Sequence, residues 1–228
     1  MRAAERYKSP EDMPRQLAVF PLQGCILLPR VLLPLNVFEP RYLALVDQAM
    51  SSTRLIGIIQ PVNAGTNGPE SPEGSNVPLR QVGCAGRIVS YQELDDGRRL
   101  ITLLGIARFQ RGEEQASTTP FRNCAADFMP FAADLEYGRG EDAVDRSAVI
   151  QALKDYVAAN RIRADLSVIM RAETELLVNT LSIIAPYGAE EKQALLEAPD
   201  LKTRAETLVA LAEMDLRASG NGSGSTLQ

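Results

Sequence analysis

The sequence predicts an α+β protein in which strands come first and helices follow. Up to about residue 132, apolar and β-branched residues form short runs separated by turn signals. From Asp142 onward the apolar residues recur at helical spacing instead. Because only one early helix is expected among several strands, a closed or half-closed barrel is favoured over a doubly wound sheet.

The change in periodicity places a boundary between the two halves near residues 135–142. Both ends of the chain are polar, and the last residues are rich in Gly and Ser, so neither end has apolar side chains to bury. The predicted organisation is therefore a disordered head at 1–16, a β pseudobarrel with one early helix at 17–135, a helical bundle at 141–217 and a disordered tail at 218–228.

Residues 17–50 predict a short strand, an apolar loop and then a helix. Pro21 cannot donate to a sheet, so the first strand ends there or lies at an edge. Pro29 and Pro34 hold the following loop extended, because the residue before a proline avoids helical geometry. Pro40 suits the first turn of a helix. The apolar residues that continue this helix are Leu43, Val46 and Met50.

The rest of the first half predicts further strands. Asp95, Asp96 and Gly97 lie between two apolar runs, which is the strongest short signal for a tight hairpin turn. Residues 61–78 form a long polar segment, for which a dispensable insertion is favoured over a mobile binding element. The expected strands are residues 55–59, 82–94, 98–109 and 121–129.

The second half predicts four helical segments. The first carries one apolar stripe, and Asp165 is expected to cap the start of the second. The stripe consists of Val149, Leu153, Tyr156 and Val157, and the later helices are expected at residues 166–184, 189–198 and 201–216.

Length and composition are those of an ordinary globular protein. The 228 residues are 45% hydrophobic and 23% charged, which is enough to bury a core. The net charge of −5 argues against a dedicated binder of nucleic-acid phosphates, which usually has a basic face. No apolar run has the length of a bilayer span or a signal peptide, so no membrane partner is expected. Cys25, Cys84 and Cys124 are widely spaced, which fits reduced thiols and a cytoplasmic location.

The composition also removes most catalytic chemistries. The chain contains no histidine, which excludes Ser–His and Cys–His nucleophile pairs and most zinc sites with mixed ligands. It has no GxxxxGK[ST] loop for nucleotide phosphates. We expect no catalytic residue, no cofactor and no metal. The lysines, which are expected to be solvated, are Lys8, Lys154, Lys192 and Lys202.

The proline-rich opening resembles the Lon protease N-terminal domain, which has the pattern PLxxxxxFPxxxxPLxxFExRY. In this chain the pattern stands as Pro21-Leu22, Leu28-Pro29, Pro34-Leu35 and Phe38-Glu39-Pro40-Arg41-Tyr42. A second match, to KQxLLE…R, is formed by Lys192-Gln193, Leu195-Leu196-Glu197 and Arg204.

The resemblance implies a six-stranded pseudobarrel related to the PUA fold, followed by a small helical bundle. It also implies a role in engaging protein substrates. In the family the domain precedes an ATPase and a Ser–Lys protease, so we expect a free-standing member without those modules.

Most residues of the matching pattern are expected to be structural. Glu39 is expected to support the helix start, and Arg41 to pair with a carboxylate or a carbonyl elsewhere in the barrel. Phe38 and Tyr42 are expected to anchor the core. Direct contact of Glu39 or Arg41 with a ligand is the alternative. Pro21, Pro29 and Pro34 complete the set of family-pattern residues.

An apolar segment between the prolines is the candidate binding surface. It is either an exposed patch that captures a partner or a buried crossover of the barrel, and the sequence supports both interpretations equally. The candidate residues are Leu27, Leu28, Val31, Leu32 and Leu33.

The leading hypothesis is a non-catalytic module that binds proteins or unfolded peptide segments, by apolar burial and by backbone pairing at a strand edge. It would act as an adaptor or modulator of proteolysis. The alternative is an RNA-binding module of PUA type. The arginines that would then form a basic patch are Arg98, Arg99, Arg108 and Arg111.

Overall fold

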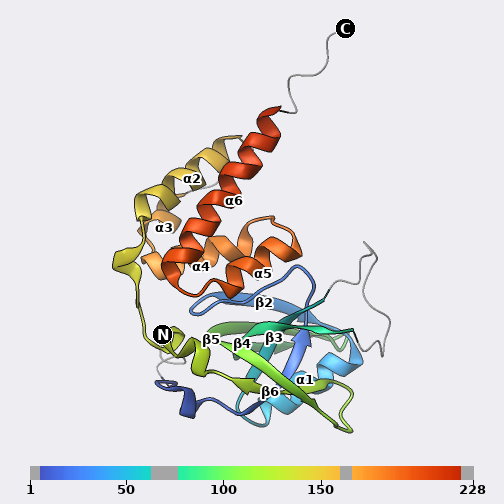
Figure 1. The fold of residues 1–228 in the computed structure, drawn as a ribbon. Helices are drawn as coiled ribbons and strands as arrows, with labels where there is room; N and C mark the ends of the chain where they lie inside the picture. Colours follow the sequence, from blue (N-terminus) through green and yellow to red (C-terminus); the bar gives the residue numbers. More distant parts are fainter. Residues whose placement is uncertain (1–5, 63–76, 160–165, 222–228) are drawn as a thin grey trace.

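The protein consists of a β barrel with a helical bundle stacked on one end (Figure 1). The computed structural model describes residues 6–62, 77–159 and 166–221. The strands all precede Asp127, and the long helices of the second half begin at Arg146. The predicted α+β class, with a six-stranded sheet followed by helices, is confirmed.

The element bounds follow the prolines, glycines and apolar runs. The strands are β1 (Gln16–Pro21), β2 (Leu32–Val37), β3 (Leu55–Pro61), β4 (Leu79–Glu93), β5 (Arg99–Gln115) and β6 (Arg122–Asp127). The helices are α1 (Pro40–Met50), α2 (Arg146–Ala159), α3 (Leu166–Arg171), α4 (Thr174–Ile184), α5 (Ala189–Glu197) and α6 (Leu201–Asn221). Short 3-10 helices are η1 (Pro10–Asp12), η2 (Met129–Leu135) and η3 (Glu141–Ala143).

The long strand β5 closes the barrel. Its first half pairs with β2 and β4, and its last residues pair with β6. Because β6 also pairs with β1, the order β1-β3-β4-β5-β6 returns on itself. Only β2 stays outside this ring, as an edge strand beside β5. Closure removes the unpaired edges that an open sheet would expose.

Two local predictions about the strands are confirmed. β1 ends at Pro21, although it lies inside the sheet between β3 and β6 and not at an edge. The hairpin between β4 and β5 turns where Asp-Gly predicts it, with the amide of Leu94 donating to the carbonyl of Arg98 at 2.9 Å. Gly97 has a φ of 84°, which side chains other than glycine rarely adopt.

The predicted disorder of the head is wrong for residues 6–16. Tyr7 and Met13 are buried against the barrel, and Arg87 donates to the Tyr7 hydroxyl at 3.0 Å. These two buried side chains hold residues 6–16 against the barrel, although most residues of the segment are polar. Residues 1–5 lie outside the described part. At the other end α6 continues to Asn221, so the predicted tail is wrong for residues 218–221, and residues 222–228 are not described.

The helix predicted over residues 166–184 is broken into α3 and α4. Arg146 caps the end of α3, because its guanidinium donates to the carbonyls of Met170 and Ala172 at 2.7 Å each. Glu141 accepts a hydrogen bond from the amide of Glu175, in the first turn of α4. The proposed cap at Asp165 and most of the 61–78 segment lie outside the described residues.

A buried ion pair joins the barrel to the bundle. Arg108 of β5 is 2% exposed and binds both carboxylate oxygens of Asp134 at 2.8 Å. The same guanidinium donates to the carbonyls of Leu196 and Ala198, at the end of α5, at 3.1 and 2.5 Å. Its positive charge also lies 4.5 Å from the ring of Phe131. One side chain therefore connects a strand, η2 and a helix end.

A second set of polar contacts crosses the same junction. The amide nitrogen of Asn179 donates to the carbonyl of Pro29 at 3.1 Å, and Arg204 donates to the Asn179 oxygen at 2.8 Å. Burial, with the nearby charge of Arg108, lowers the pKa of Arg204 to about 10, so this guanidinium stays charged at neutral pH. Gln60 and Gln193 bond to each other at 3.0 Å on the other side of the junction. One apolar cluster contains residues of both halves, and whether they fold as separate domains stays a prediction.

The junction predicts that removing one of two nearby carboxylates, Asp134 or Glu136, lowers the free energy of unfolding by very different amounts. Asp134→Ala should lower the free energy of unfolding by about 3–5 kcal/mol, because it leaves the charge of Arg108 buried without its partner. Glu136→Ala should change it by less than about 1 kcal/mol, because the Glu136–Arg139 pair is exposed to solvent. Urea unfolding of both variants measures the difference. Equal losses would show that the buried pair is not what holds the junction.

Candidate functional site

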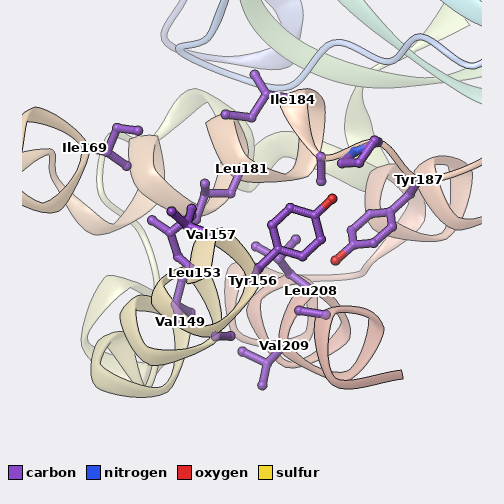
Figure 2. Close-up of a pocket in the computed structure, with 14 residues that line it drawn as sticks. Val149, Leu153, Tyr156, Val157, Ile169, Leu181, Ile184, Tyr187, Leu208 and Val209 are labelled. Atoms are coloured by element: carbon purple, nitrogen blue, oxygen red, sulfur yellow. The ribbon is translucent and has the colours of Figure 1, made fainter. Parts of the chain in front are cut away.

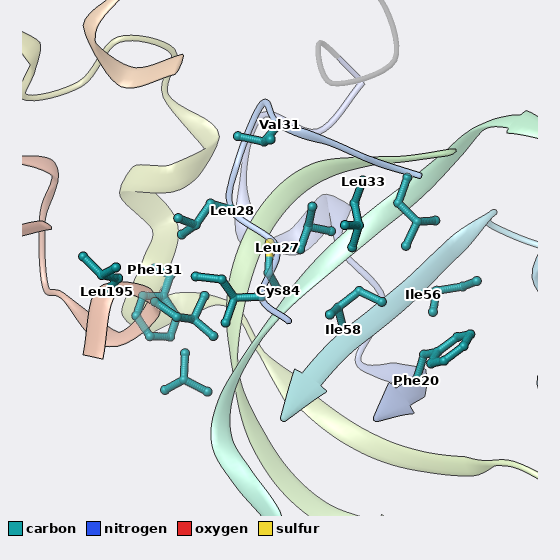
Figure 3. Packing of buried hydrophobic residues seen from close by; sticks show 14 of the residues in the cluster. Phe20, Leu27, Leu28, Val31, Leu33, Ile56, Ile58, Cys84, Phe131 and Leu195 are labelled. Carbon is teal, nitrogen blue, oxygen red and sulfur yellow. The ribbon is translucent and has the colours of Figure 1, made fainter. Parts of the chain in front are cut away.

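The apolar segment between the prolines is mostly a buried crossover. Leu27 and Leu28 are fully buried, and Val31 and Leu33 are 5% and 9% exposed. Figure 3 shows these side chains within the cluster that also contains Ile58 and Cys84. The exposed-patch interpretation is therefore wrong for these residues. Leu32 alone among the candidates is exposed, at 57%.

Two glycines explain why this segment lies so close to the barrel. A side chain at Gly105 would place its Cβ 2.0 Å from the carbonyl oxygen of Leu28, and one at Gly86 would meet Leu27 at 2.6 Å. The backbone of the segment crosses β4 and β5 where no side chain is present. Isolated glycines inside strands mark such close approaches, so Gly86 and Gly105 are the sequence signals for the crossover.

After the crossover the chain forms β2, a strand at positions where the sequence predicts only an extended loop. The amide of Gly105 donates to the carbonyl of Val31 at 2.9 Å, and the register continues with Leu33 opposite Leu103. In an antiparallel pair hydrogen-bonded and non-hydrogen-bonded positions alternate. The peptide groups of Leu32, Pro34 and Asn36 therefore point away from β5. Pro34 is tolerated because its missing N–H would face outward.

The outer edge of β2 has no strand partner among the described residues. The strand alternates strictly, so Leu33 and Val37 face the core while Leu32, Pro34 and Asn36 are exposed. Leu100 and Thr102 of β5 lie opposite Asn36 and Pro34. Together with Ser90 and Gln92 of β4 they line a shallow depression of about 410 Å³. The edge thus combines unpaired backbone groups with an exposed leucine.

The family-pattern residues form a separate cluster around the start of α1. The ring of Tyr42 stacks on Phe20 with a centroid distance of 3.9 Å, which confirms Tyr42 as a core anchor. Arg41 pairs with the carboxylate of Glu39 at 2.7 Å and lies over the Tyr42 ring. Its partner is therefore the neighbouring N-cap residue of α1, and the prediction of a partner elsewhere in the barrel is wrong. Phe38 is 56% exposed, so its prediction as a core anchor is wrong. The residue precedes Glu39, the N-cap of α1, where the chain has left the barrel.

The arginines proposed for RNA do not form a basic patch. Arg108 is buried in the junction described above. Arg98 pairs with Asp96 at 2.6 Å, and Arg99 pairs with Glu93 at 2.9 Å. Each exposed cation of this set has a carboxylate beside it, which cancels the field that a phosphate backbone would need. Nothing in this geometry favours the RNA-binding alternative.

Metal ligands and reactive thiols are the remaining groups to compare with the sequence predictions. The described residues contain no group of three or more acidic or Cys side chains that could hold a metal ion. Burial raises the pKa of the Cys124 thiol to about 11 and raises that of Cys84 further, so both stay protonated and poorly nucleophilic. No helix in the described part has the length and apolar character needed to cross a bilayer.

Comparison with known proteins identifies the family. The model of the ATP-dependent protease La (LON) substrate-binding domain matches residues 16–213. This chain belongs to that family. Lon proteases of Flavobacterium johnsoniae and Cytophaga hutchinsonii are each 27% identical over 91% of the chain. The chain spans only 26% and 25% of their lengths, in other words about a quarter of each.

Solved structures of the family share the fold. The Lon N-terminal domain protein from Xanthomonas campestris superposes with a TM-score of 0.59 at 20% identity, covering 86% of this chain and 97% of that one. The N-terminal domain of Mycobacterium avium complex Lon protease gives 0.61 at 16% identity, covering 87% and 98%. The pseudobarrel followed by helices is therefore the fold of Lon N-terminal domains.

The geometry of the family pattern predicts unequal effects of removing its aromatic residues. Tyr42→Ala should cost about 3–5 kcal/mol of unfolding free energy, because it leaves a cavity beside Phe20. Phe38→Ala should change it by at most about 0.5 kcal/mol, since the ring is mostly in solvent. Urea denaturation measures both. A large loss in Phe38→Ala would mean that this ring packs against the protein after all.

Proposed function

We propose that this protein is a non-catalytic module that binds extended apolar segments of protein substrates at the outer edge of β2. The observation that carries the proposal is the unpaired outer edge of β2, with Leu32 exposed where the strand begins. An incoming strand would pair with the outward peptide groups of Leu32 and Asn36 and cover the leucine side chain. Affinity would come from hydrogen bonds between the two backbones, and selectivity from the substrate side chain that lies beside Leu32.

The family supports this function, and the location of the edge supports the site. The matching family is described as a substrate-binding domain, and the full-length relatives are proteases of which this chain spans a quarter. That relationship supports, as part of the proposal, a role as adaptor or modulator of proteolysis in the cytoplasm. The three thiols are all unpaired, which agrees with a reducing compartment.

The proposal predicts that a charge on the β2 edge abolishes capture. Leu32→Asp should weaken binding of fluorescently labelled casein by about tenfold or more, because burial of one leucine is worth about 1.5–3 kcal/mol. Met129→Asp is the matched control, since Met129 is 62% exposed on η2, away from β2. Fluorescence anisotropy measures affinity, and circular dichroism with urea unfolding checks that both variants fold.

A second variant tests the backbone contribution. Asn36→Pro removes an amide that points outward and leaves the ladder to β5 intact, so it should weaken casein binding without unfolding the barrel. If both β2 variants bind casein like the unmodified protein, the site is wrong. If the unmodified protein itself does not bind casein or any other unfolded chain, the function is wrong.

A further inference from the structure

An apolar cavity of about 370 Å³ lies within the helical bundle, far in the sequence from the β2 edge. It opens between α2, α4 and α6, with Ile169 of α3 at one end (Figure 2). The predicted stripe of α2 lines it, and of that stripe Val149 is buried while Leu153, Tyr156 and Val157 are half-buried. The stripe that the sequence predicts therefore borders an unfilled space.

The size of this cavity exceeds that of a packing fault. Apolar cavities of about 150 Å³ already accept a molecule such as benzene. Ligand sites for small molecules begin at about 300 Å³ and are lined mainly by apolar side chains with a few polar groups. The cavity matches that description, because twelve of its fourteen lining residues are aliphatic, alanine or proline.

The polar groups of the lining are gathered at one end. They are the phenols of Tyr156 and Tyr187, whose rings lie side by side (Figure 2). Burial and the Asp215 carboxylate, together with Tyr156, raise the pKa of Tyr187 to about 12. Burial and Asp215 also raise the pKa of Tyr156. Both phenols therefore stay neutral, and a carboxylate lies near enough to act on each.

The charges distinguish among possible ligands. None of the fourteen lining residues is charged, and a site for a fatty acid or another anion would need an arginine or a lysine at its polar end. The Asp215 carboxylate would repel an anionic group there and attract a cation. Aromatic rings beside an ammonium add a further favourable contact.

We propose that this cavity binds a small amphipathic molecule, with its aliphatic body among α2, α4 and α6 and an ammonium or hydroxyl group at the two phenols. The occupant is a free small molecule, because the site is a pocket with one polar end and not an extended groove. The proposal does not rest on casein capture at β2, and it assigns the helical half a ligand of its own.

A series with one chain and three head groups tests the proposal. Octylamine, octanol and octanoate are titrated into the full protein, and binding is followed by intrinsic tyrosine fluorescence and by two-dimensional NMR. The chain contains no tryptophan, so the fluorescence comes from its six tyrosines, of which Tyr156 and Tyr187 line the cavity. Octylamine and octanol should bind saturably, and octanoate about tenfold or more weakly than octylamine. Asp215→Asn should reduce the difference in affinity between octylamine and octanoate.

A matched pair of variants locates the site. Ala152→Leu fills the cavity from α2 and should weaken octylamine binding by about tenfold or more. Ala158→Leu places the same side chain on the exposed side of α2 and should leave binding unchanged. Urea unfolding checks that both variants fold.

Each of three results would overturn the proposal. They are binding of octanoate as tight as that of octylamine, equal binding by the two alanine variants, and absence of saturable binding by any member of the series. Displacement of octylamine by unlabelled casein would show that the pocket receives peptide side chains instead. Loss of casein binding in Leu32→Asp with octylamine binding retained would show that the two sites are separate.

Discussion

The burial of Arg108 is the constraint on which the rest of the structure depends. A guanidinium inside a barrel wall is costly unless its donors are paired, and here Asp134 and two carbonyls at the end of α5 accept hydrogen bonds from all three of its nitrogens. Those partners come from the segment after the last strand and from the bundle. The barrel wall is therefore complete only when the helices are docked. The polar junction fixes their position, and the shared apolar cluster supplies most of the stabilisation.

Features set by local rules could be predicted from the sequence. The Asp-Gly turn, the helix start at Pro40 and the change from strand to helix periodicity depend on residues adjacent in the chain. Features set by distant partners could not. Tyr7 is held in place by a hydrogen bond from Arg87. The break between α3 and α4 is stabilised by hydrogen bonds from Arg146 to the end of α3. Each of these contacts joins residues too far apart for periodicity to reveal.

The candidate site shows the same division. The apolar composition of the segment from Leu27 to Leu33 predicted a place of interest, but composition does not distinguish a crossover from a patch. Gly86 and Gly105 decide this, because Gly105 leaves room for the backbone of Leu28 and Gly86 for the side chain of Leu27. Strand alternation then exposes Leu32 and buries its neighbours. The cavity between α2, α4 and α6 could not be predicted for a related reason. An apolar stripe has the same spacing in the sequence whether or not the facing helices fill the space beside it.

Barrel closure leaves β2 as a strand with one unpaired side, which is where the proposed substrate strand would add. Each strand of the ring has a partner on both sides over part of its length, whereas β2 is paired on one side only, so its outer edge presents unpaired peptide groups. An edge of this kind invites pairing between identical molecules. Pro34 limits that pairing, because it removes the central outward N–H and leaves donors only at Leu32 and Asn36. A flexible substrate segment can adjust to two separated donors, whereas a second rigid β2 would have to oppose its own proline.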